Sequence, residues 1–464
     1  MRIFMPFSLS FISHTALTIF CSLALNNVAT AQPDSDGNQH HNKHHQQQNN
    51  AQSSEHDSST GQKHGGGHSA GGHSAGGHAG GGHGGGHGHH GMVHKDAKKF
   101  PSTSYSETKH ARAISRPTMP GIKGDAAKGK QLAYAKSKGR CLACHIMGAD
   151  AAQAGDVGLN LSRYGTLGRD DNYIFQQVWD ARAHNPNTLM PPFGTHGILN
   201  KHEVMHIVAY LKTLKHEVAA PQRPQLQARN FLVAKDDFTG ADEYVEKGAK
   251  LFAKPAKSGK ACASCHNDKA SAGNLQGVAA TYPKYLPAVK KIINIEDRIN
   301  LCRKSAMNAH PYKLGSKHLN MLSSYVKYLS RNTPINVATD GPAASAIQRG
   351  KGAFFAKAGQ LNFSCADCHT TAANKWLRGQ PLSSIKTGGK HSYTASTWPK
   401  HFIAGHDLGL ISLQQRIHHC QAVTRTVPLK LGSPEYTEME LYLTTLANGT
   451  PMLAPTKSKL RGQD

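Results

Sequence analysis

The sequence is short of acidic side chains, aromatic side chains and cysteine. It has 29 Asp and Glu against 54 Lys and Arg, a formal net charge of +25, and only 7% of its 464 residues are aromatic. At 38% hydrophobic residues the chain can form several cores, but it cannot be a multi-span membrane protein. Large apolar side chains are almost missing between residue 32 and residue 100, so an evenly composed globule is excluded.

The first 31 residues predict a signal peptide. Arg2 supplies a basic start, an apolar stretch follows, and Ala-Thr-Ala at 29–31 is a small-x-small cleavage site. An uncleaved membrane anchor is the alternative, but His14 interrupts the apolar stretch. We therefore expect cleavage, export to the periplasm and no stable membrane insertion afterwards.

Residues 32–120 predict a disordered leader rich in His and Gly. It carries 14 histidines between His40 and His94, and from His64 to His94 Gly-Gly-His recurs irregularly. Closely spaced imidazoles on a flexible chain can bind Cu(II), Ni(II) or Zn(II). A soluble, pH-sensitive tether is the alternative interpretation.

The few cysteines are strictly patterned. Six of the nine form three CxxCH motifs, in which two thiols can add to the vinyl groups of haem and the histidine can bind its iron. A single motif could be a redox dithiol or half a zinc site, but three copies behind an export signal predict three covalently bound haem c groups. The motif residues are Cys141, Cys144 and His145; Cys262, Cys265 and His266; and Cys365, Cys368 and His369.

Each motif is flanked by segments that predict helices. Glycine-containing helices are expected at 129–135, 244–252 and 347–355, and amphipathic helices at 200–211, 319–329 and 433–449. Asn200 with Glu203 forms a capping box, and Ser433 precedes Pro434 as cap and first residue of the last helix. Two terminal helices around a CxxCH haem are the cytochrome c arrangement. We therefore predict a mainly α protein with three cytochrome c-like haem units in series and much irregular loop.

Each motif is followed by a candidate second iron ligand. Met190 lies on a Pro-rich loop, which favours it over His184 and His196 in the first unit. Cys302 and Cys420 are the cysteines left over in the second and third units, and we predict that they bind iron. The alternatives are a Cys302–Cys420 disulfide, or ligation by other side chains, namely Met307 or His310 in the second unit and His418, His419 or Met439 in the third.

Further motifs carry a resemblance to a known family. In the first half they are Gly139-Arg140 before the CxxCH and Asn-Thr-Leu-Met-Pro-Pro-Phe-Gly at 187–194. In the second half they include Arg-Ile-Asn-Leu-Cys-Arg at 298–303, Leu-Arg-Gly at 377–379, and Arg416 four residues before Cys420. Residues 121–218 thereby resemble SoxX, and residues 230–452 the dihaem form of SoxA, in the Sox cytochrome complex of bacterial thiosulfate oxidation.

The resemblance implies an enzyme, an L-cysteine S-thiosulfotransferase. In that family the cysteine matching Cys420 ligates the active-site haem, and the arginine matching Arg416 belongs to the same site. Thiosulfate is joined oxidatively to a cysteine of the carrier protein SoxYZ, and a small soluble c-type cytochrome takes the electrons. Residues 219–464 hold 33 basic and 15 acidic side chains, a field that suits the thiosulfate dianion or, alternatively, acidic partner proteins rather than nucleic acid.

The predicted organisation has six segments, with the two Sox-like parts fused in one chain. They are the signal peptide 1–31, the leader 32–120, a SoxX-like domain 121–218, a linker 219–229, a first SoxA-like domain 230–335 and a second, catalytic one 336–464. Two other functions remain open from the sequence. One is a thiosulfate dehydrogenase that forms tetrathionate without a carrier, and the other is a non-catalytic electron-transfer protein.

Overall fold

The computed structural model describes residues 116–148, 153–223, 241–267, 273–385, 398–403 and 409–459. The predicted signal peptide, nearly all of the histidine-rich leader and part of the predicted linker lie outside these residues, so those segments and the domain boundaries stay predictions. All described residues belong to one unit, 84–464.

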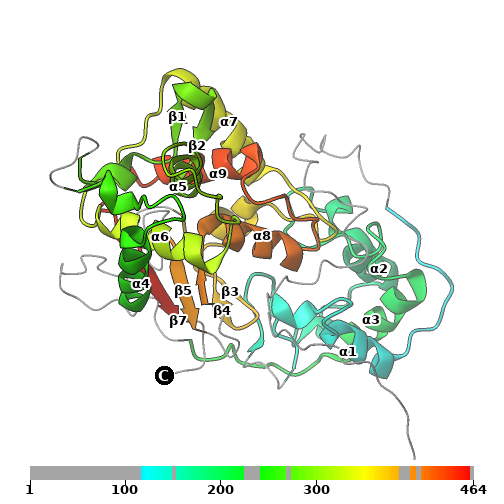
Figure 1. Ribbon diagram of the computed structural model, residues 1–464. Helices are drawn as coiled ribbons and strands as arrows, with labels where there is room; N and C mark the ends of the chain where they lie inside the picture. The colour runs from blue at the N-terminus through cyan, green and yellow to red at the C-terminus, as the bar shows by residue number, and fades with distance from the viewer. Residues whose placement is uncertain are drawn as a thin grey trace, which may run out of the picture. The chain divides into compact units, whose positions relative to one another are not determined.

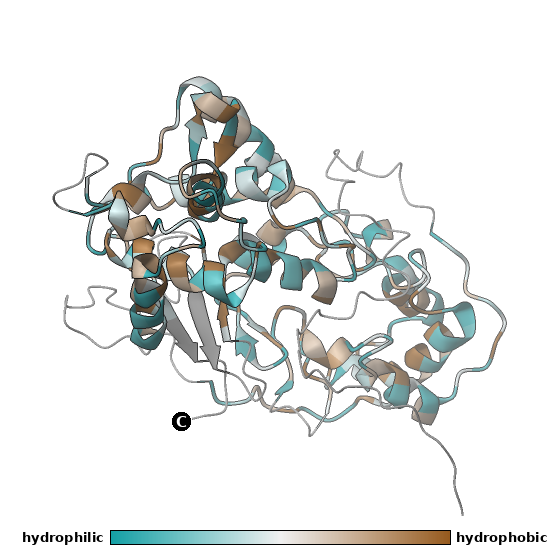
Figure 2. Ribbon diagram, viewed as in Figure 1, coloured by the Kyte–Doolittle hydropathy of each residue, from teal (hydrophilic) through white to brown (hydrophobic). Residues whose placement is uncertain are grey.

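The first cytochrome-like region contains three helices, α1 (Ala126–Tyr134), α2 (Asp171–Asp180) and α3 (Lys201–Thr213). Asp125 caps α1, and Asn200 and Glu203 form the predicted capping box at the start of α3. Packing of α1 and α2 against α3 buries a core that includes Phe175, Ile207 and Val208. The helices alternate hydrophilic and hydrophobic surface along their length, as amphipathic helices do (Figure 2).

The second region is built in the same order around α4 (Asp242–Ala253) and α6 (Lys317–Tyr328). Between them lie an antiparallel hairpin, β1 (Lys284–Leu286) with β2 (Lys291–Ile293), and the helix α5 (Ile295–Ser305). Figure 1 shows α4 beside α6, and these two helices pack against each other.

The third region pairs α7 (Gly341–Phe355) with α9 (Pro434–Thr445) and carries α8 (Leu413–Val423) between them. It also contains a short hairpin, β3 (Trp376–Leu377) with β4 (Gln380–Pro381). A three-stranded sheet has the order β6 (Gly409–Ile411), β5 (Lys400–Ile403), β7 (Thr456–Lys459), with β5 antiparallel to β6 and parallel to β7 (Figure 1).

The same glycine contact joins the paired helices in all three regions. A Cβ on Gly129 of α1 would lie 1.9 Å from the carbonyl oxygen of His206 in α3. The corresponding distances are 2.2 Å from Gly248 to Met321 O and 2.1 Å from Gly350 to Glu438 O. No side chain fits at such distances, so glycine lets the backbones of the two helices touch.

The observed helices confirm a mainly α chain, and each predicted helical segment falls on an observed helix. The last helix is shorter than predicted, because α9 ends at Thr445 and successive turns then lead to Gly449 at φ +80°. The small sheets were not predicted, since their strands have two to four residues and leave little alternation in the sequence. In the described part of the chain, no helix has the length and apolar character needed to span a membrane.

Candidate haem sites

The first CxxCH lies on a 3-10 turn, Cys141–Ala143, directly after the α1 region. Burial raises the pKa of the Cys141 thiol to about 12 and that of Cys144 to about 11. The ring of His145 places Nδ1 2.8 Å from the carbonyl oxygen of Leu159. A Cβ on Gly158 would lie 2.2 Å from that ring, so a glycine is needed beside it.

The third CxxCH has the same histidine arrangement. Nδ1 of His369 lies 2.8 Å from the carbonyl oxygen of Ser383, which follows it by 14 residues, as Leu159 follows His145. Asp367, inside the motif, accepts hydrogen bonds from Ser364 N and Lys357 Nζ, both at 2.9 Å. The motif is therefore held from both sides, and its histidine is oriented by the backbone.

Helix α8 brings Cys420 and Arg416 to the third motif. A capping box of Ser412 and Gln415 starts the helix. Arg416 and Cys420 follow one turn apart on one face of it. Burial raises the pKa of Cys365 and of Cys368 to about 12, and the nearby Cys420 thiol raises both further. Burial also lowers the pKa of His369, the bond to Ser383 opposes this, and the positive charge of Arg416 lowers it again. The structure thus places both predicted catalytic residues at the third site.

The second CxxCH has two sulfur neighbours. Sγ of Cys262 lies 3.9 Å from Sδ of the buried Met307. Burial raises the pKa of Cys262, with Arg303 opposing this and Cys302 adding to it, so Cys302 on α5 is close as well. Nδ1 of His266 is buried without a hydrogen-bond partner among the described residues, and the segment 268–272 that follows it lies outside them.

The alternative ligands have other partners. In the first region Met190 packs against the core cluster that also contacts Cys141, whereas His184 Nε2 lies 3.0 Å from Gln176 Oε1 and His196 Nδ1 2.9 Å from Gln360 O. In the third region His418 Nδ1 lies 3.2 Å from Leu429 O, and Met439 is part of the packed core. Cys302 and Cys420 are free thiols. The Nδ1 contacts of His196 and His418 are of the same kind as those of His145 and His369 and do not exclude these alternatives, so Met190, Cys302 and Cys420 stay predicted ligands.

The first and third motifs adjoin each other. Arg378 N donates to Ala143 O at 2.9 Å, and Asp156 N donates to Trp376 O at 2.9 Å. Arg378 lowers the pKa of Cys144 and of Cys368 against the larger effect of burial, and the Cys144 charge raises that of Cys368. One guanidinium thus acts on a thiol of each motif.

The donor sets fit covalently bound haem. Each motif offers a pair of free thiols on one turn. In His145 and His369 the backbone carbonyl engages Nδ1, which leaves Nε2 as the nitrogen for iron. The donor set of the second motif consists of the thiols of Cys262 and Cys265 and of His266, whose Nδ1 has no hydrogen-bond partner among the described residues.

Such a helical chain with CxxCH turns between paired helices is a c-type cytochrome. A model of the SoxA/TsdA cytochrome c domain matches residues 247–335, and a cytochrome c model matches residues 126–215. The subunit SoxA of L-cysteine S-thiosulfotransferase from Pseudaminobacter salicylatoxidans is 34% identical over 46% of this chain and 70% of its own length. The Rhodovulum sulfidophilum subunit is 32% identical over 48% and 74%.

The chain therefore belongs to the SoxA family of L-cysteine S-thiosulfotransferase subunits. Among solved structures, SoxXA from P. pantotrophus matches with 26% identity and a TM-score of 0.41, over 47% of this chain and 78% of that chain. The resemblance of the second half to SoxA is confirmed, and residues 126–215 match a cytochrome c domain, while their likeness to SoxX stays a prediction.

Some residues of the contact between the first and third regions could not be found from sequence. Buried Arg425 donates to Gln360 Oε1 at 3.1 Å and to Ser137 O at 3.1 Å, and Gln360 Nε2 donates to His196 O at 3.1 Å. An arginine and a glutamine in loops give no periodic signal. The sequence hints were Gly359-Gln360 and Leu-Arg-Gly at 377–379, both part of the family resemblance.

Proposed function

We propose that this chain is a periplasmic enzyme with three haem c groups that joins thiosulfate to a cysteine of a SoxYZ-type carrier protein. The observation that supports it most is the pair Arg416 and Cys420, one turn apart on α8 and both acting on the residues of the third CxxCH. The relatives that carry the name L-cysteine S-thiosulfotransferase support the reaction class.

The reaction forms one S–S bond and releases two electrons. The carrier thiolate and the outer sulfur of thiosulfate become a Cys–S–S–SO₃⁻ adduct, and the thiol proton goes to solvent. Arg416 binds the sulfonate oxygens, because a guanidinium can pair bidentately with an oxyanion. Cys420 and His369 are the residues that would hold the iron of the third haem. Haem, when bound, supplies one-electron acceptance, and a thiolate ligand lowers its potential.

The first site is the proposed electron exit toward a small soluble cytochrome. The bonds Arg378 N to Ala143 O and Asp156 N to Trp376 O keep the first and third motifs together. Met190 is the proposed second iron ligand there, and Cys302 that of the second haem. Residues 1–31 support export, which N-terminal sequencing of the mature protein tests. Copper, nickel or zinc binding by the His-rich leader is tested by calorimetric titration of the full chain.

The experiment that tests the proposed function compares Cys420→Ala with Cys302→Ala. Both cysteines lie four residues after an arginine on a capped helix, so they form a matched pair. We expect Cys420→Ala to keep three covalent haems and to lose thiosulfate-dependent reduction in the presence of carrier, while Cys302→Ala keeps most of it. Equal activity in the two variants would overturn the assignment to the third site.

The second candidate function is thiosulfate dehydrogenase. It is favoured by the matching domain model, which covers both SoxA and TsdA. Tetrathionate formed by the purified protein from thiosulfate alone would establish it. A pure electron conduit, the third candidate, predicts no thiosulfate-dependent reduction with or without carrier.

A further inference from the structure

The second and third regions repeat one pair of helices. α5 and α8 each begin at a capping box, with Asn294 and Ser412 as N-caps, and each carries a cysteine eight residues after its cap. α6 and α9 each begin after Leu-Gly-Ser, with Ser316 and Ser433 as N-caps. The starts of α5 and α8, which lie far apart in the sequence, line one small chamber.

The lining of this chamber follows the repeat. Asn294 corresponds to Ser412, Glu296 to Gln414, and Leu314 to Leu431, and all of them line it. The two Leu-Gly loops interlock, since a Cβ on Gly315 would lie 2.9 Å from Leu431 Cδ1 and one on Gly432 2.3 Å from Leu314 Cδ1. The cavity measures about 10 Å³, close to the smallest space that holds one water molecule.

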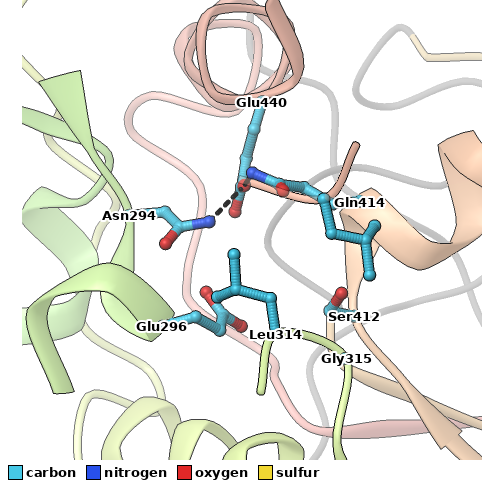
Figure 3. A pocket seen from close by; sticks show the side chains of 8 residues that line it. Asn294, Glu296, Leu314, Gly315, Ser412, Gln414 and Glu440 are labelled. Carbon is cyan, nitrogen blue, oxygen red and sulfur yellow. Dashed lines mark hydrogen bonds between the residues drawn. The ribbon is translucent and has the colours of Figure 1, made fainter. Parts of the chain in front are cut away.

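Glu440, from α9, also lines the chamber (Figure 3). Its Oε2 accepts hydrogen bonds from Asn294 Nδ2 at 2.9 Å and from Gln414 Nε2 at 3.1 Å. One donor comes from the cap of α5 and the other from the first turn of α8. This single carboxyl group therefore holds the starts of both cysteine-bearing helices.

Glu296 is the second carboxyl group of the chamber. Its Oε1 accepts from Ser323 Oγ at 2.6 Å, whereas its Oε2 is buried without a partner in the described part of the chain. Glu296 and Glu440 are each 5% exposed. An unpaired buried carboxylate oxygen is costly, because it has lost its hydration without a hydrogen bond in return.

The charges around the chamber are unbalanced. Burial and the charge of Glu296 raise the pKa of Glu440 to about 7, while Lys327 on α6 opposes them. On α5, Asp297 is also subject to the charge of Glu296, and Lys291 of β2 partly offsets it. α8 and the two Leu-Gly loops line the chamber with neutral residues only. Two carboxylates that line one buried chamber repel each other, so the Glu440 carboxyl loses its proton only near neutrality.

We propose that Glu296 and Glu440 form a shared-proton site at the junction of the two repeats, and that its protonation tunes the Cys302 and Cys420 haem sites together. Glu296 precedes Cys302, and Gln414 precedes Cys420, by six residues of helix. Six residues span about 9 Å, close enough for one charge to act on both sites through a dry interior. This proposal depends on the proposed function in one respect, namely that Cys302 and Cys420 are iron ligands.

The direction of the effect follows from charge. When the pair loses its proton to solvent as pH rises, a negative charge is added near both sites, which favours the oxidised form of each. The two potentials should therefore fall with rising pH over one common window. The first haem, whose candidate ligands His145 and Met190 are not in this chamber, should change much less.

The test is a redox titration of the holoprotein between about pH 4 and about pH 9, a range that brackets the ordinary and the raised carboxyl pKa. We expect Glu440→Gln to remove the common pH-dependent shift and fix both potentials at their low-pH values. Glu296→Gln should move the window to lower pH, because it removes the repulsion that raises the pKa of Glu440. Glu435→Gln, an exposed carboxyl group on the same helix, is the matched control and should titrate like the wild type.

A wild-type shift that Glu440→Gln leaves in place, or potentials that do not change with pH, would overturn the proposal. If Glu440→Gln fails to fold, infrared spectroscopy of the wild-type protein decides. A protonated carboxyl C=O band at neutral pH supports the shared proton, and its absence refutes it. Thiosulfate turnover is assayed separately from the potentials, so the two proposals can fail independently. Turnover with pH-independent potentials would refute this site alone, and pH-linked potentials without turnover would refute the proposed function alone.

Discussion

Replacement of Gly350 by alanine should separate the α7–α9 pair that supports the third haem site. The added Cβ would lie 2.1 Å from the carbonyl oxygen and 2.5 Å from the carbonyl carbon of Glu438, whereas ordinary contact begins at 3.4 Å. The obstacle is backbone, so α9 has to move by more than an ångström. Overpacking of this kind costs about 1–3 kcal/mol, which outweighs the gain of up to about 1 kcal/mol from alanine in a helix.

Gly352 in the same helix provides the control. It is exposed, and a Cβ there would meet no atom within 4 Å, so Gly352→Ala should stabilise the protein by about 0.5–1 kcal/mol. Thermal unfolding of the two holoproteins, followed by haem absorbance and by circular dichroism, measures the difference. We expect Gly350→Ala to lower the melting temperature and Gly352→Ala to raise it. Shifts of the same sign and size would refute the close crossing of α7 and α9.

Two further predictions concern charged side chains. Arg416→Gln should raise KM for thiosulfate roughly 10-fold or more with unchanged haem content, because a charge-assisted contact is lost. The control Arg298→Gln, at the corresponding position of α5, should leave KM unchanged. Steady-state kinetics with carrier measure both values, and equal KM values in the two variants would contradict the prediction. Asp180 is fully buried, and burial tends to raise its pKa, but hydrogen bonds from Arg182 and Thr195 outweigh this and lower it. The stability that these bonds contribute is present at neutral pH and lost as pH falls through the lowered pKa. Asp180→Asn should therefore cost about 2–3 kcal/mol at neutral pH and less in acid, and urea unfolding that shows equal costs at both would exclude this role.

The positions of the haem motifs and their helices could be predicted because they follow local rules. The CxxCH spacing defines the thiols and the histidine, and capping pairs such as Asn200–Glu203 and Ser433–Pro434 fix where helices begin. The window between each motif and its closing helix singles out Met190, Cys302 and Cys420 as candidates, and their binding to iron stays a prediction. Arg416 entered only through the family resemblance, and its placement beside His369 agrees with it.

Contacts between distant segments could not be predicted in this way. Nothing in the sequence around Asp156 indicates that it meets Trp376, 220 residues later. Glu440 lies on an amphipathic helix among residues such as Thr437 and Thr444, and its burial depends on amide partners from α5 and α8. Such contacts depend on how the three helical regions assemble, and a single sequence contains no direct signal of that.

The repeat raises the question of why one arginine–cysteine pair should react with substrate and the other should not. Arg298 and Cys302 are spaced like Arg416 and Cys420 on equally capped helices, so the helix itself cannot make the difference. Their surroundings do differ. Met307 packs on Cys262 at the second site, whereas at the third site Arg416 acts on His369, and Cys368 is coupled through Arg378 to Cys144 of the first motif. Among the described residues, the third site combines the proposed anion-binding group Arg416 with a direct contact to the first motif, the proposed electron exit, so the proposed reaction is expected there even though both helices share one design.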